Sequence, residues 1–313
     1  MAIDSNSPAF DAGDDAHPPS YPFDQRGVPR PQFDHIDIGA YEFAPCSEIT
    51  CPADITQSND AGECGAIVNY SVPGSNNAEC GTITCSPASG SFFPIGETGV
   101  TCNSTAGPSC NFKVTVNDTE KPTVTAPANI TVGNTPGQCS AKVNPGTATT
   151  GDNCPGATVN GVRSDGLALT APYPVGTTTI TWTATDVHTN TSAPATQTVR
   201  VRDAQLPSVT NVSASPSALR PPDHTMRNVT VNYTAADNCS APTCTLTVTS
   251  NEAINGLGDG DKAPDWQIVD AHHVRLRSER SGTGTGRVYT IKITCRDGAG
   301  NQTVKTTQVR VPR

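Results

Sequence analysis

Charged and aromatic side chains are scarce in this sequence. Asp, Glu, Lys and Arg together supply 16% of its 313 residues, and Phe, Trp and Tyr supply 5%. The charges that are present are mainly acidic, with a net charge of −9. Because nucleic-acid binding depends on Lys and Arg to neutralise phosphates, this balance argues against a nucleic-acid partner. A run of about 18 apolar residues is also missing, so we expect no membrane-spanning segment.

Glycine and proline are abundant without dominating the sequence. Each occurs 27 times, which together is about a sixth of the chain and lies below the roughly 25–30% typical of low-complexity segments. Turn-rich β-structure is therefore the better expectation. The length suits two or three domains.

Twelve cysteines are present, mostly at regular intervals within strand-like segments. The CxxC and HxxxH spacings typical of zinc sites do not occur, so we expect disulfides formed in an oxidising, extracellular compartment. The residues after Met1, "AIDSNSPAF", lack the basic and apolar regions of a signal peptide. We therefore expect the chain to be a mature or partial form of a secreted protein.

A ten-residue phrase occurs twice in the sequence. "FPIGETGVTC" ends at Cys102, and "YPVGTTTITW" ends at Trp182, 80 positions later. Further pairs, such as "CPADIT" with "APANIT" and "GECGAIVN" with "GQCSAKVN", keep the spacing between 74 and 86. These correspondences predict two copies of one module, over residues 44–121 and 122–206. Alternation in the strand period, as in Thr179–Thr185, predicts an antiparallel β-sandwich for each copy.

A third, longer module is expected over residues 207–313. It keeps the tripeptide "DNC" at residues 237–239, and its Asp297 and Asn301 stand where Asp186 and Asn190 stand in the second module. A proline follows each junction between modules, which favours short and stiff linkers.

The first two modules resemble the hyalin repeat, an immunoglobulin-like module of extracellular proteins. The motif that carries the resemblance, within residues 46–203, is "CPADI…GECGAIV…C…CSPASGSFFPIG…VTC…C.FKVTVND.EKP". Through "NGLGDGDKAPDW" and "LRSERSGTGTGRVYTIKITC", the third module resembles an immunoglobulin-like domain found beside hyalin repeats in secreted bacterial proteins. The resemblance implies an all-β fold of tandem immunoglobulin-like β-sandwiches. It also implies a role in adhesion or architecture, without catalytic residues.

Comparison of the two copies suggests how the cysteines pair. Cys64 and Cys80 have counterparts in Cys139 and Cys154, whereas four further cysteines of the first copy, Cys51, Cys85, Cys102 and Cys110, align with Ala126, Gly161, Trp182 and Ala195. Because a bridge is gained or lost as a pair, the comparison predicts Cys64–Cys80 and Cys139–Cys154. For the other four, the preferred bridges are Cys51–Cys110 and Cys85–Cys102, and Trp182 would fill the vacated volume.

The third module has an odd number of cysteines. Cys244 and Cys295 lie in the strand-like segments "TCTLTV" and "IKITC" and form the favoured pair. Cys46 and Cys239 are then left over, either as free thiols or as a bridge between chains.

No motif in the sequence indicates catalysis. None of the six histidines stands in a nucleophile or HExxH context. The glycine-rich "SGTGTGR", from Ser281 to Arg287, lacks the Gly-Lys-Ser/Thr ending of a phosphate loop and favours a hairpin turn. We therefore expect no enzyme activity in this chain.

Calcium is the one candidate cofactor. Carboxylate oxygens are ligands that Ca²⁺ prefers, and the third module groups four of them in and near one loop: Glu252, Asp259, Asp261 and Asp265. The alternative is an ordinary solvated acidic turn. Asp118 with Glu120, at the first junction, is a second candidate group.

Glycan attachment is suggested by N-x-S/T triplets, which also arise by chance in a Thr- and Ser-rich sequence. The candidate asparagines are Asn69, Asn103, Asn117, Asn129, Asn190, Asn211, Asn228, Asn232, Asn238 and Asn301.

Residues 1–43 differ in composition from the modules. They hold eight acids and two bases, and so carry −6 of the net charge of −9. The phrase "DQRGVPRPQFDHIDIGAYEF" resembles the closing stretch of bacterial right-handed parallel β-helix surface proteins. Since a single β-helix rung cannot bury its apolar face, we expect a short N-terminal β-segment that has lost its upstream rungs or needs another partner.

Two functions from different classes follow. The leading one is a non-catalytic extracellular or cell-surface protein: a stalk, an adhesive protein or a filament subunit, with itself or surface and matrix glycans as partners. In the filament hypothesis, the strand-like "HIDIGAYEF" from His35 to Phe43 adds head to tail to an open sheet edge of another copy. The alternative is that this segment is a frayed or folded-back stump. The competing class is the accessory portion of a secreted polysaccharide-active β-helix enzyme.

Overall fold

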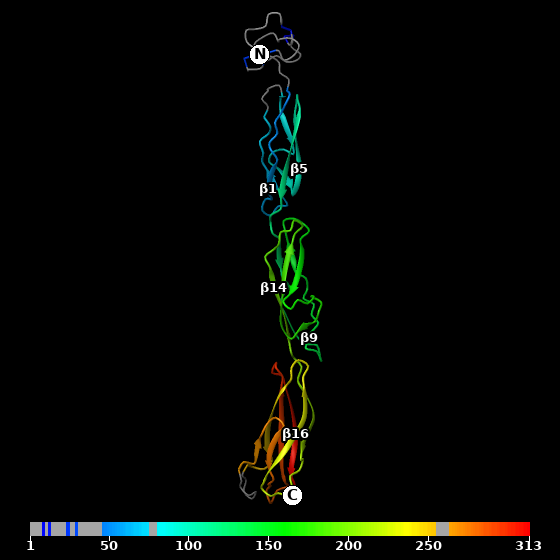
Figure 1. Cartoon of the computed structure of the whole chain (residues 1–313), viewed down its shortest axis with the longest axis vertical. Helices are drawn as coiled ribbons and strands as arrows, with labels where there is room; N and C mark the ends of the chain where they lie inside the picture. The colour runs from blue at the N-terminus through cyan, green and yellow to red at the C-terminus, as the bar shows by residue number, and fades with distance from the viewer. Residues whose placement is uncertain are drawn as a thin grey trace. The chain divides into compact units, whose positions relative to one another are not determined.

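The computed structural model describes residues 8–9, 12–13, 23–25, 29–30, 46–74, 80–254 and 263–313. Every named element in these residues is a β-strand, as Figure 1 shows. The all-β fold class is therefore confirmed. No helix among the described residues is long and apolar enough to cross a membrane. The predicted β-segment at His35 to Phe43 lies outside the described residues.

The first group of strands falls within the first predicted module. It consists of β1 (Ile55–Ser58), β2 (Gly65–Val68), β3 (Ile83–Ser86), β4 (Ser91–Pro94), β5 (Gly96–Ser104) and β6 (Ser109–Asn117). One sheet has the order β1-β6-β5-β3, with β1 parallel to β6, and the other pairs β2 with β4. Alternate residues of β6, Phe112, Val114 and Val116, are buried in the core of this group, as the strand period requires.

The second group repeats this sheet order. It consists of β7 (Thr123–Thr125), β8 (Ile130–Gly133), β9 (Ser140–Ala141), β10 (Thr149–Gly151), β11 (Thr158–Arg163), β12 (Tyr173–Pro174), β13 (Gly176–Thr185) and β14 (Ala195–Arg202). Its main sheet has the order β11-β13-β14-β8, and β8 again lies parallel to the last strand. The matching topology agrees with two copies of one module. Ile180, Trp182 and Tyr173 are buried in its core.

The third group carries the largest cluster of buried apolar residues. It consists of β15 (Ser208–Ser215), β16 (Met226–Ala236), β17 (Thr243–Ser250), β18 (Trp266–Ile268), β19 (His273–Arg277), β20 (Arg287–Arg296) and β21 (Gln302–Val311). Two sheets, β15-β16-β19-β18 and β17-β20-β21, supply the buried residues. Leu276, Tyr289, Ile291 and Ile293 are fully buried among them.

Each sheet is built from the strands of one group, but the chain forms two compact units. The first unit comprises Met1–Thr123, Thr150–Thr158 and Ala184–Ser192. The second comprises Val124–Thr149, Val159–Thr183 and Ala193–Arg313. Loops of the second strand group thus belong to the first unit. The division into domains at residues 43, 121 and 206 stays a prediction.

All twelve cysteines form disulfides, and part of the predicted pairing is wrong. Three bonds agree with the expected pairs: Cys51–Cys110, Cys85–Cys102 and Cys244–Cys295. The predicted Cys64–Cys80 and Cys139–Cys154 do not form. The structure has Cys46–Cys80, Cys64–Cys154 and Cys139–Cys239 instead, so Cys46 and Cys239 are not left over.

The error came from assuming that bridges close within one copy. Cys80, Cys154 and Cys239 each bond to a cysteine that lies 34, 90 or 100 residues upstream. Cys64 and Cys139 occupy the same position in the two copies. Each bonds to a cysteine further along the chain, beyond the end of its own strand group. Cys64, Cys139 and Cys154 therefore take part in bonds between successive groups, whereas Cys80 bonds within the first module and the cysteines that vanish in the second copy crosslink one group internally.

Candidate functional site

Two equivalent clusters of acidic and amide side chains lie where one strand group follows another. The first cluster consists of Asp118, Asp152, Asn153, Asp186, His188 and Asn190, all within the first unit. The second cluster consists of Asp203, Asp237, Asn238, Asp297 and Asn301, all within the second unit. Their residues stand next to strand ends: Asp118 directly follows β6, Asp152 follows β10 and Asp186 follows β13.

The side chain of Asp118, in the first cluster, is 0% exposed. Its Oδ1 accepts hydrogen bonds from the Glu120 backbone N–H at 3.1 Å and from Asn153 Nδ2 at 3.4 Å. Its Oδ2 lies 3.1 Å from His188 Nδ1. Carboxylate oxygens of Asp118 and Asp186 and a nitrogen of His188 lie within 4.8 Å of one another.

A hydrogen-bonded loop fixes Asp186. Its Oδ1 accepts from the backbone N–H groups of His188 and Asn190, both at 2.8 Å, and its Oδ2 accepts from Asn190 Nδ2 at 2.8 Å. Burial by itself raises the pKa of Asp186, but these hydrogen bonds outweigh it and lower the pKa overall. Asn190 Nδ2 also donates to the backbone carbonyl of Asp118 at 3.2 Å. The loop therefore holds an ionised carboxylate at the end of β6.

Asp152 and Asn153 bring oxygens that have no hydrogen-bond partner. Both carboxylate oxygens of Asp152 and the amide Oδ1 of Asn153 are buried and unpaired. Burial raises the pKa of Asp152, and the carboxylates of Asp118 and Asp186 raise it further. The backbone N–H groups of Cys154 and Asn153 lie close enough to lower that pKa in part, although neither makes a well-formed hydrogen bond to the carboxylate. Asn153 Nδ2 donates to the Glu63 carbonyl at 3.0 Å, so the Oδ1 atom of Asn153 lies on the side of the amide group away from that carbonyl.

The second cluster reproduces these contacts. Asn301 donates to Asp297 from its backbone N–H and its Nδ2, each at 2.8 Å, as Asn190 does to Asp186. Asn238 Nδ2 donates to the Gln138 carbonyl at 2.9 Å, and its Oδ1 is buried and unpaired, as is Oδ1 of Asp237. The two clusters differ in two ways: Ala299 stands where the first has His188, and Asp237 Oδ2 accepts from the Cys239 backbone N–H at 3.0 Å, whereas neither oxygen of Asp152 is paired. The same arrangement is thus built twice.

A disulfide adjoins each cluster. Cys154 follows Asn153 and is bonded to Cys64, and Cys239 follows Asn238 and is bonded to Cys139. Each bond ties the loop that holds the unpaired oxygens to the preceding strand group. It therefore fixes the distance between carboxylates from the two groups.

The sequence singled out a different loop for calcium. Asp259 and Asp261 lie outside the described residues. Asp265 and Glu252 face Arg287, whose Nη2 lies 2.8 Å from Asp265 Oδ2 and whose Nε lies 3.6 Å from Glu252 Oε2. These two carboxylates already have a cationic partner. Of the second predicted group, Asp118 belongs to the first cluster, whereas the carboxylate of Glu120 accepts a hydrogen bond from the Gly62 backbone N–H at 2.7 Å.

Sequence reasoning missed most of the cluster residues. The signal was present, since "DNC", the Asp-x-x-x-Asn spacing and an Asp shortly before each junction proline all recur. Only the fold shows that these three features converge.

Arg287 is the centre of a buried ionic group in the third strand group. Its side chain is 0% exposed, and Nη1 lies 3.0 Å from Glu279 Oε1. Burial raises the pKa of Glu279, with a further contribution from Asp265. Tyr289 accepts a hydrogen bond from Arg287 at 3.2 Å, and burial raises the pKa of Tyr289 to about 12. This group is enclosed among strands, so its role is structural.

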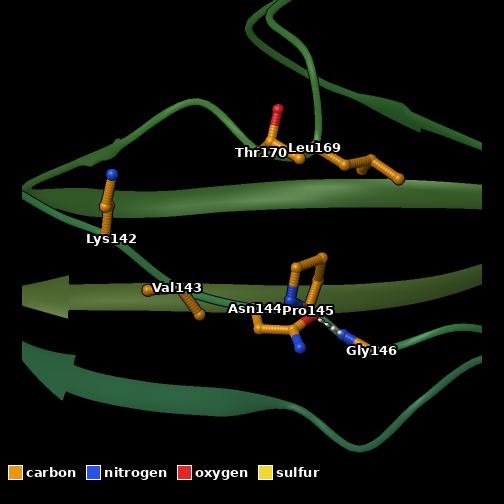
Figure 2. Close-up of a pocket in the computed structure, with 7 residues that line it drawn as sticks. All are labelled: Lys142, Val143, Asn144, Pro145, Gly146, Leu169 and Thr170. Carbon is orange, nitrogen blue, oxygen red and sulfur yellow. Dashed lines mark hydrogen bonds between the residues drawn. The ribbon is translucent and has the colours of Figure 1, made fainter.

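A surface pocket of about 490 Å³ lies in the second unit, and Figure 2 shows seven residues that line it. They are Lys142, Val143, Asn144, Pro145, Gly146, Leu169 and Thr170. Lys142 is the one ionisable side chain among them. These seven residues therefore hold no pair of groups for acid–base or nucleophilic chemistry.

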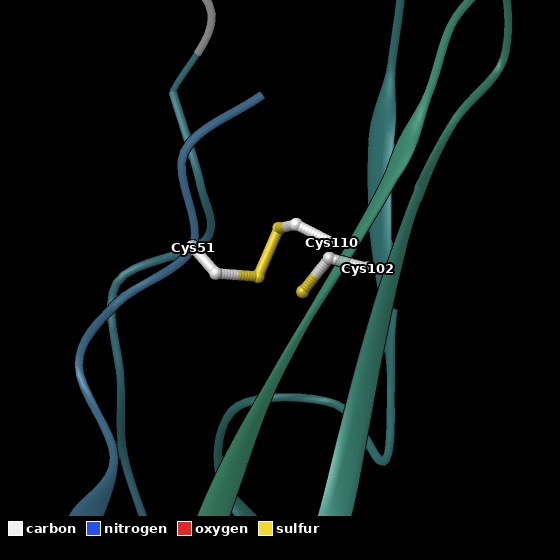
Figure 3. A group of neighbouring side chains, drawn as sticks. All are labelled: Cys51, Cys102 and Cys110. Atoms are coloured by element: carbon white, nitrogen blue, oxygen red, sulfur yellow. A yellow bond between two sulfur atoms is a disulfide. The ribbon is translucent and has the colours of Figure 1, made fainter. Parts of the chain in front are cut away.

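Three cysteine sulfurs gather in the core of the first strand group. Figure 3 shows Cys51 bonded to Cys110, with Cys102 beside them. Cys102 is bonded to Cys85. A metal ion would need thiolate ligands. All three sulfurs are in two adjacent disulfides instead, so this group does not serve as a metal site.

The predicted glycan-acceptor asparagines fall into two sets. Seven are exposed: Asn69, Asn103, Asn117, Asn129, Asn211, Asn228 and Asn232. Asn190, Asn238 and Asn301 are only partly exposed and use Nδ2, the atom to which a glycan would attach, for the cluster hydrogen bonds.

Comparisons with known proteins identify no family for the chain. No family model and no curated protein matches it. Among solved structures, it is similar to Drosophila N-cadherin EC1-4, with 8% identity over 85% of this chain and 75% of that one at a TM-score of 0.32. Mouse Protocadherin-24 EC1-3 matches with 13% identity over 87% of this chain and 99% of that one, also at 0.32. Drosophila OTK extracellular domains 3-5 match with 13% identity over 69% and 70%, at 0.25.

Proposed function

We propose that this chain is a non-catalytic extracellular structural protein, whose tandem immunoglobulin-like modules serve as a load-bearing spacer or adhesive array. The observation that carries the proposal is a series of three overlapping disulfides. The Cys46–Cys80 loop encloses Cys64, and the Cys64–Cys154 loop encloses Cys139, which bonds to Cys239. Disulfides of this kind persist in oxidising, extracellular compartments.

The overlap matters when the chain is pulled from its ends. Between Cys46 and Cys239, the covalent path runs through the disulfides and through two short segments, residues 64–80 and 139–154. The remaining residues of this stretch cannot be extended while the bonds are intact. A chain built in this way resists elongation even if its sheets open, which suits a structural protein.

Stretching single molecules of the full chain tests this function. With the disulfides intact, the fully extended length should be shorter than that of the reduced chain by about 700 Å, given about 3.5 Å per extended residue and the further loop closed by Cys244–Cys295. Cys139→Ser combined with Cys239→Ser should recover roughly a third of that length without reductant, because the path from Cys46 to Cys239 then has to include residues 154–239. Equal extended lengths before and after reduction would contradict the proposal.

Assembly into a filament is the finer form of this proposal. The donor segment, His35 to Phe43, lies outside the described residues. Acceptor edges are offered by strands that end their sheets, such as β3 and β11, because an edge strand keeps unpaired backbone groups. Sedimentation velocity should show the full chain associating with concentration and a variant without residues 1–43 remaining monomeric. A full chain that is equally monomeric would contradict the filament.

A further inference from the structure

We infer that the two junction clusters are calcium sites, one in each unit, and that Ca²⁺ holds the end of one strand group to the loops of the next. The first site would use Asp118, Asp152, Asn153 and Asp186. The second would use Asp203, Asp237, Asn238 and Asp297. The inference is independent of filament formation, since a monomer that binds Ca²⁺ satisfies it.

The charge of each cluster is the first argument. Three carboxylates meet in each, and among the described residues no Lys or Arg forms a salt bridge with any of the six. The His188 ring contacts the first cluster through Asp118, with Nδ1 3.1 Å from Oδ2, and the second cluster has Ala299 in that position. Buried carboxylates without a counter-charge are strongly unfavourable, so a cation is the missing partner.

The unpaired oxygens are a second and independent argument. Both oxygens of Asp152 and the Oδ1 atoms of Asn153, Asp237 and Asn238 are shielded from water and accept no hydrogen bond. Buried polar atoms in native proteins nearly always have a partner. The amide nitrogens of Asn153 and Asn238 are fixed on backbone carbonyls, so each amide presents its oxygen in a fixed direction. These oxygens could coordinate a cation, and no group in the described residues donates a hydrogen bond to them.

The ligand type favours calcium. The proposed ligands of each cluster are carboxylate and amide oxygens from three separate loops. The second cluster contains no histidine, so its candidate ligands are all oxygens. Ca²⁺ accepts six to eight oxygen ligands in flexible geometry, whereas Mg²⁺ demands near-ideal octahedral geometry and keeps several waters. Each disulfide ties one of the three loops to the preceding strand group. The amide of Asn190 or Asn301 joins the other two by a hydrogen bond, so the ligands are held near one another before the ion binds.

Isothermal titration of the full chain with CaCl₂ tests the inference. We expect two sites, with dissociation constants on the order of 10⁻⁴ to 10⁻³ M, as in extracellular modules. Asp152→Asn should remove the first site and Asp237→Asn the second, so that each variant binds one ion and the double variant none. Mg²⁺ at the same concentration should bind more weakly.

Thermal unfolding separates a calcium ligand from a residue that serves only the fold. In EDTA, Asp152→Asn and Asp237→Asn should leave the melting temperature unchanged or raise it, because each removes an unpaired buried charge. In Ca²⁺, the same variants should melt below the unsubstituted chain, since a ligand that binds the native state stabilises it. Equal shifts in EDTA and in Ca²⁺, or a chain that binds no Ca²⁺, would overturn the inference.

Two matched controls complete the experiment. Glu97→Gln removes one exposed carboxylate that pairs with Lys113 on the surface, and it should leave both sites intact. Asp259→Asn with Asp261→Asn should also leave two ions bound. If this last variant alone abolishes calcium binding, the junction clusters are not the sites and the inference fails.

Discussion

The indole ring of Trp182 packs directly against Gly161. A Cβ atom at residue 161 would come within 2.6 Å of that ring. In the first strand group, Cys85 and Cys102 hold the corresponding positions in the repeat and form a disulfide. The second copy thus replaces a crosslink by a buried ring and makes room for it with a glycine. Trp182 is 3% exposed, and its Nε1 donates to Gln197 at 3.2 Å.

Gly161→Ala should therefore destabilise the second strand group. Overpacking a filled core typically lowers the unfolding free energy by about 1–3 kcal/mol. Tryptophan fluorescence during urea unfolding, in a Trp266→Phe background, would report on Trp182 alone. Gly99→Ala is the matched control, because a Cβ there meets nothing within 4 Å. If the two alanine variants are equally stable, Trp182 does not fill the space at Gly161 as described.

Cyanogen bromide cleavage distinguishes the disulfide pairings. The chain has two methionines, so the reagent cuts within the chain at Met226. Cys139–Cys239 spans that cut, and we expect the two fragments to migrate together without reductant and apart with it. Cys239→Ser should release the fragments in both conditions. Separation of the unsubstituted fragments without reductant would favour the pair Cys139–Cys154.

Arg287→Met should strongly destabilise the third strand group. The substitution leaves Asp265 buried without its counter-charge, and among the described residues it leaves Glu279 with Arg277 as its one guanidinium partner. Breaking such a buried group typically costs about 3–5 kcal/mol. Chemical denaturation measures the loss. Arg275→Met, on the exposed side of β19, should change the unfolding free energy by less than about 0.5 kcal/mol. A similar small effect for Arg287→Met would show that the buried ion pairs contribute little.

Asp165 should make stability depend on pH in the acid range. Hydrogen bonds from the buried Arg163, with Nε 2.9 Å from Asp165 Oδ1, lower the pKa of Asp165 below its usual 3.8. Because the folded-state pKa is depressed, the stabilisation is present above the unfolded-state pKa and is lost as the pH falls through the folded-state value. The melting temperature of the unsubstituted chain should therefore exceed that of Asp165→Asn at pH 6.

That difference should shrink as the pH falls below about 4. In an Arg163→Met background, Asp165→Asn should produce no such pH-dependent difference. A difference that stays constant down to pH 2 would contradict the assigned role of Arg163.

The sequence by itself determined the all-β fold, the internal repeat and three of the six disulfides. Apolar alternation reports directly which face of a strand is buried, as in β6, because the period of two is a local property of the chain. Cys85–Cys102 and Cys244–Cys295 join directly opposed residues of neighbouring strands. Comparison of the two copies suggested the first bond, and the strand-like segments of the third module suggested the second.

Only the tertiary structure decided which loops meet. Cys64 lies 90 residues from Cys154 and reaches it across the junction of two strand groups, a contact that no local period encodes. Asp118, Asp152 and Asp186 come together for the same reason, since each follows a different strand end. Asp265, a candidate calcium ligand from the sequence, is instead buried against Arg287. Local sequence patterns determine which segments form strands. Which distant strand ends meet depends on how the folded sheets pack.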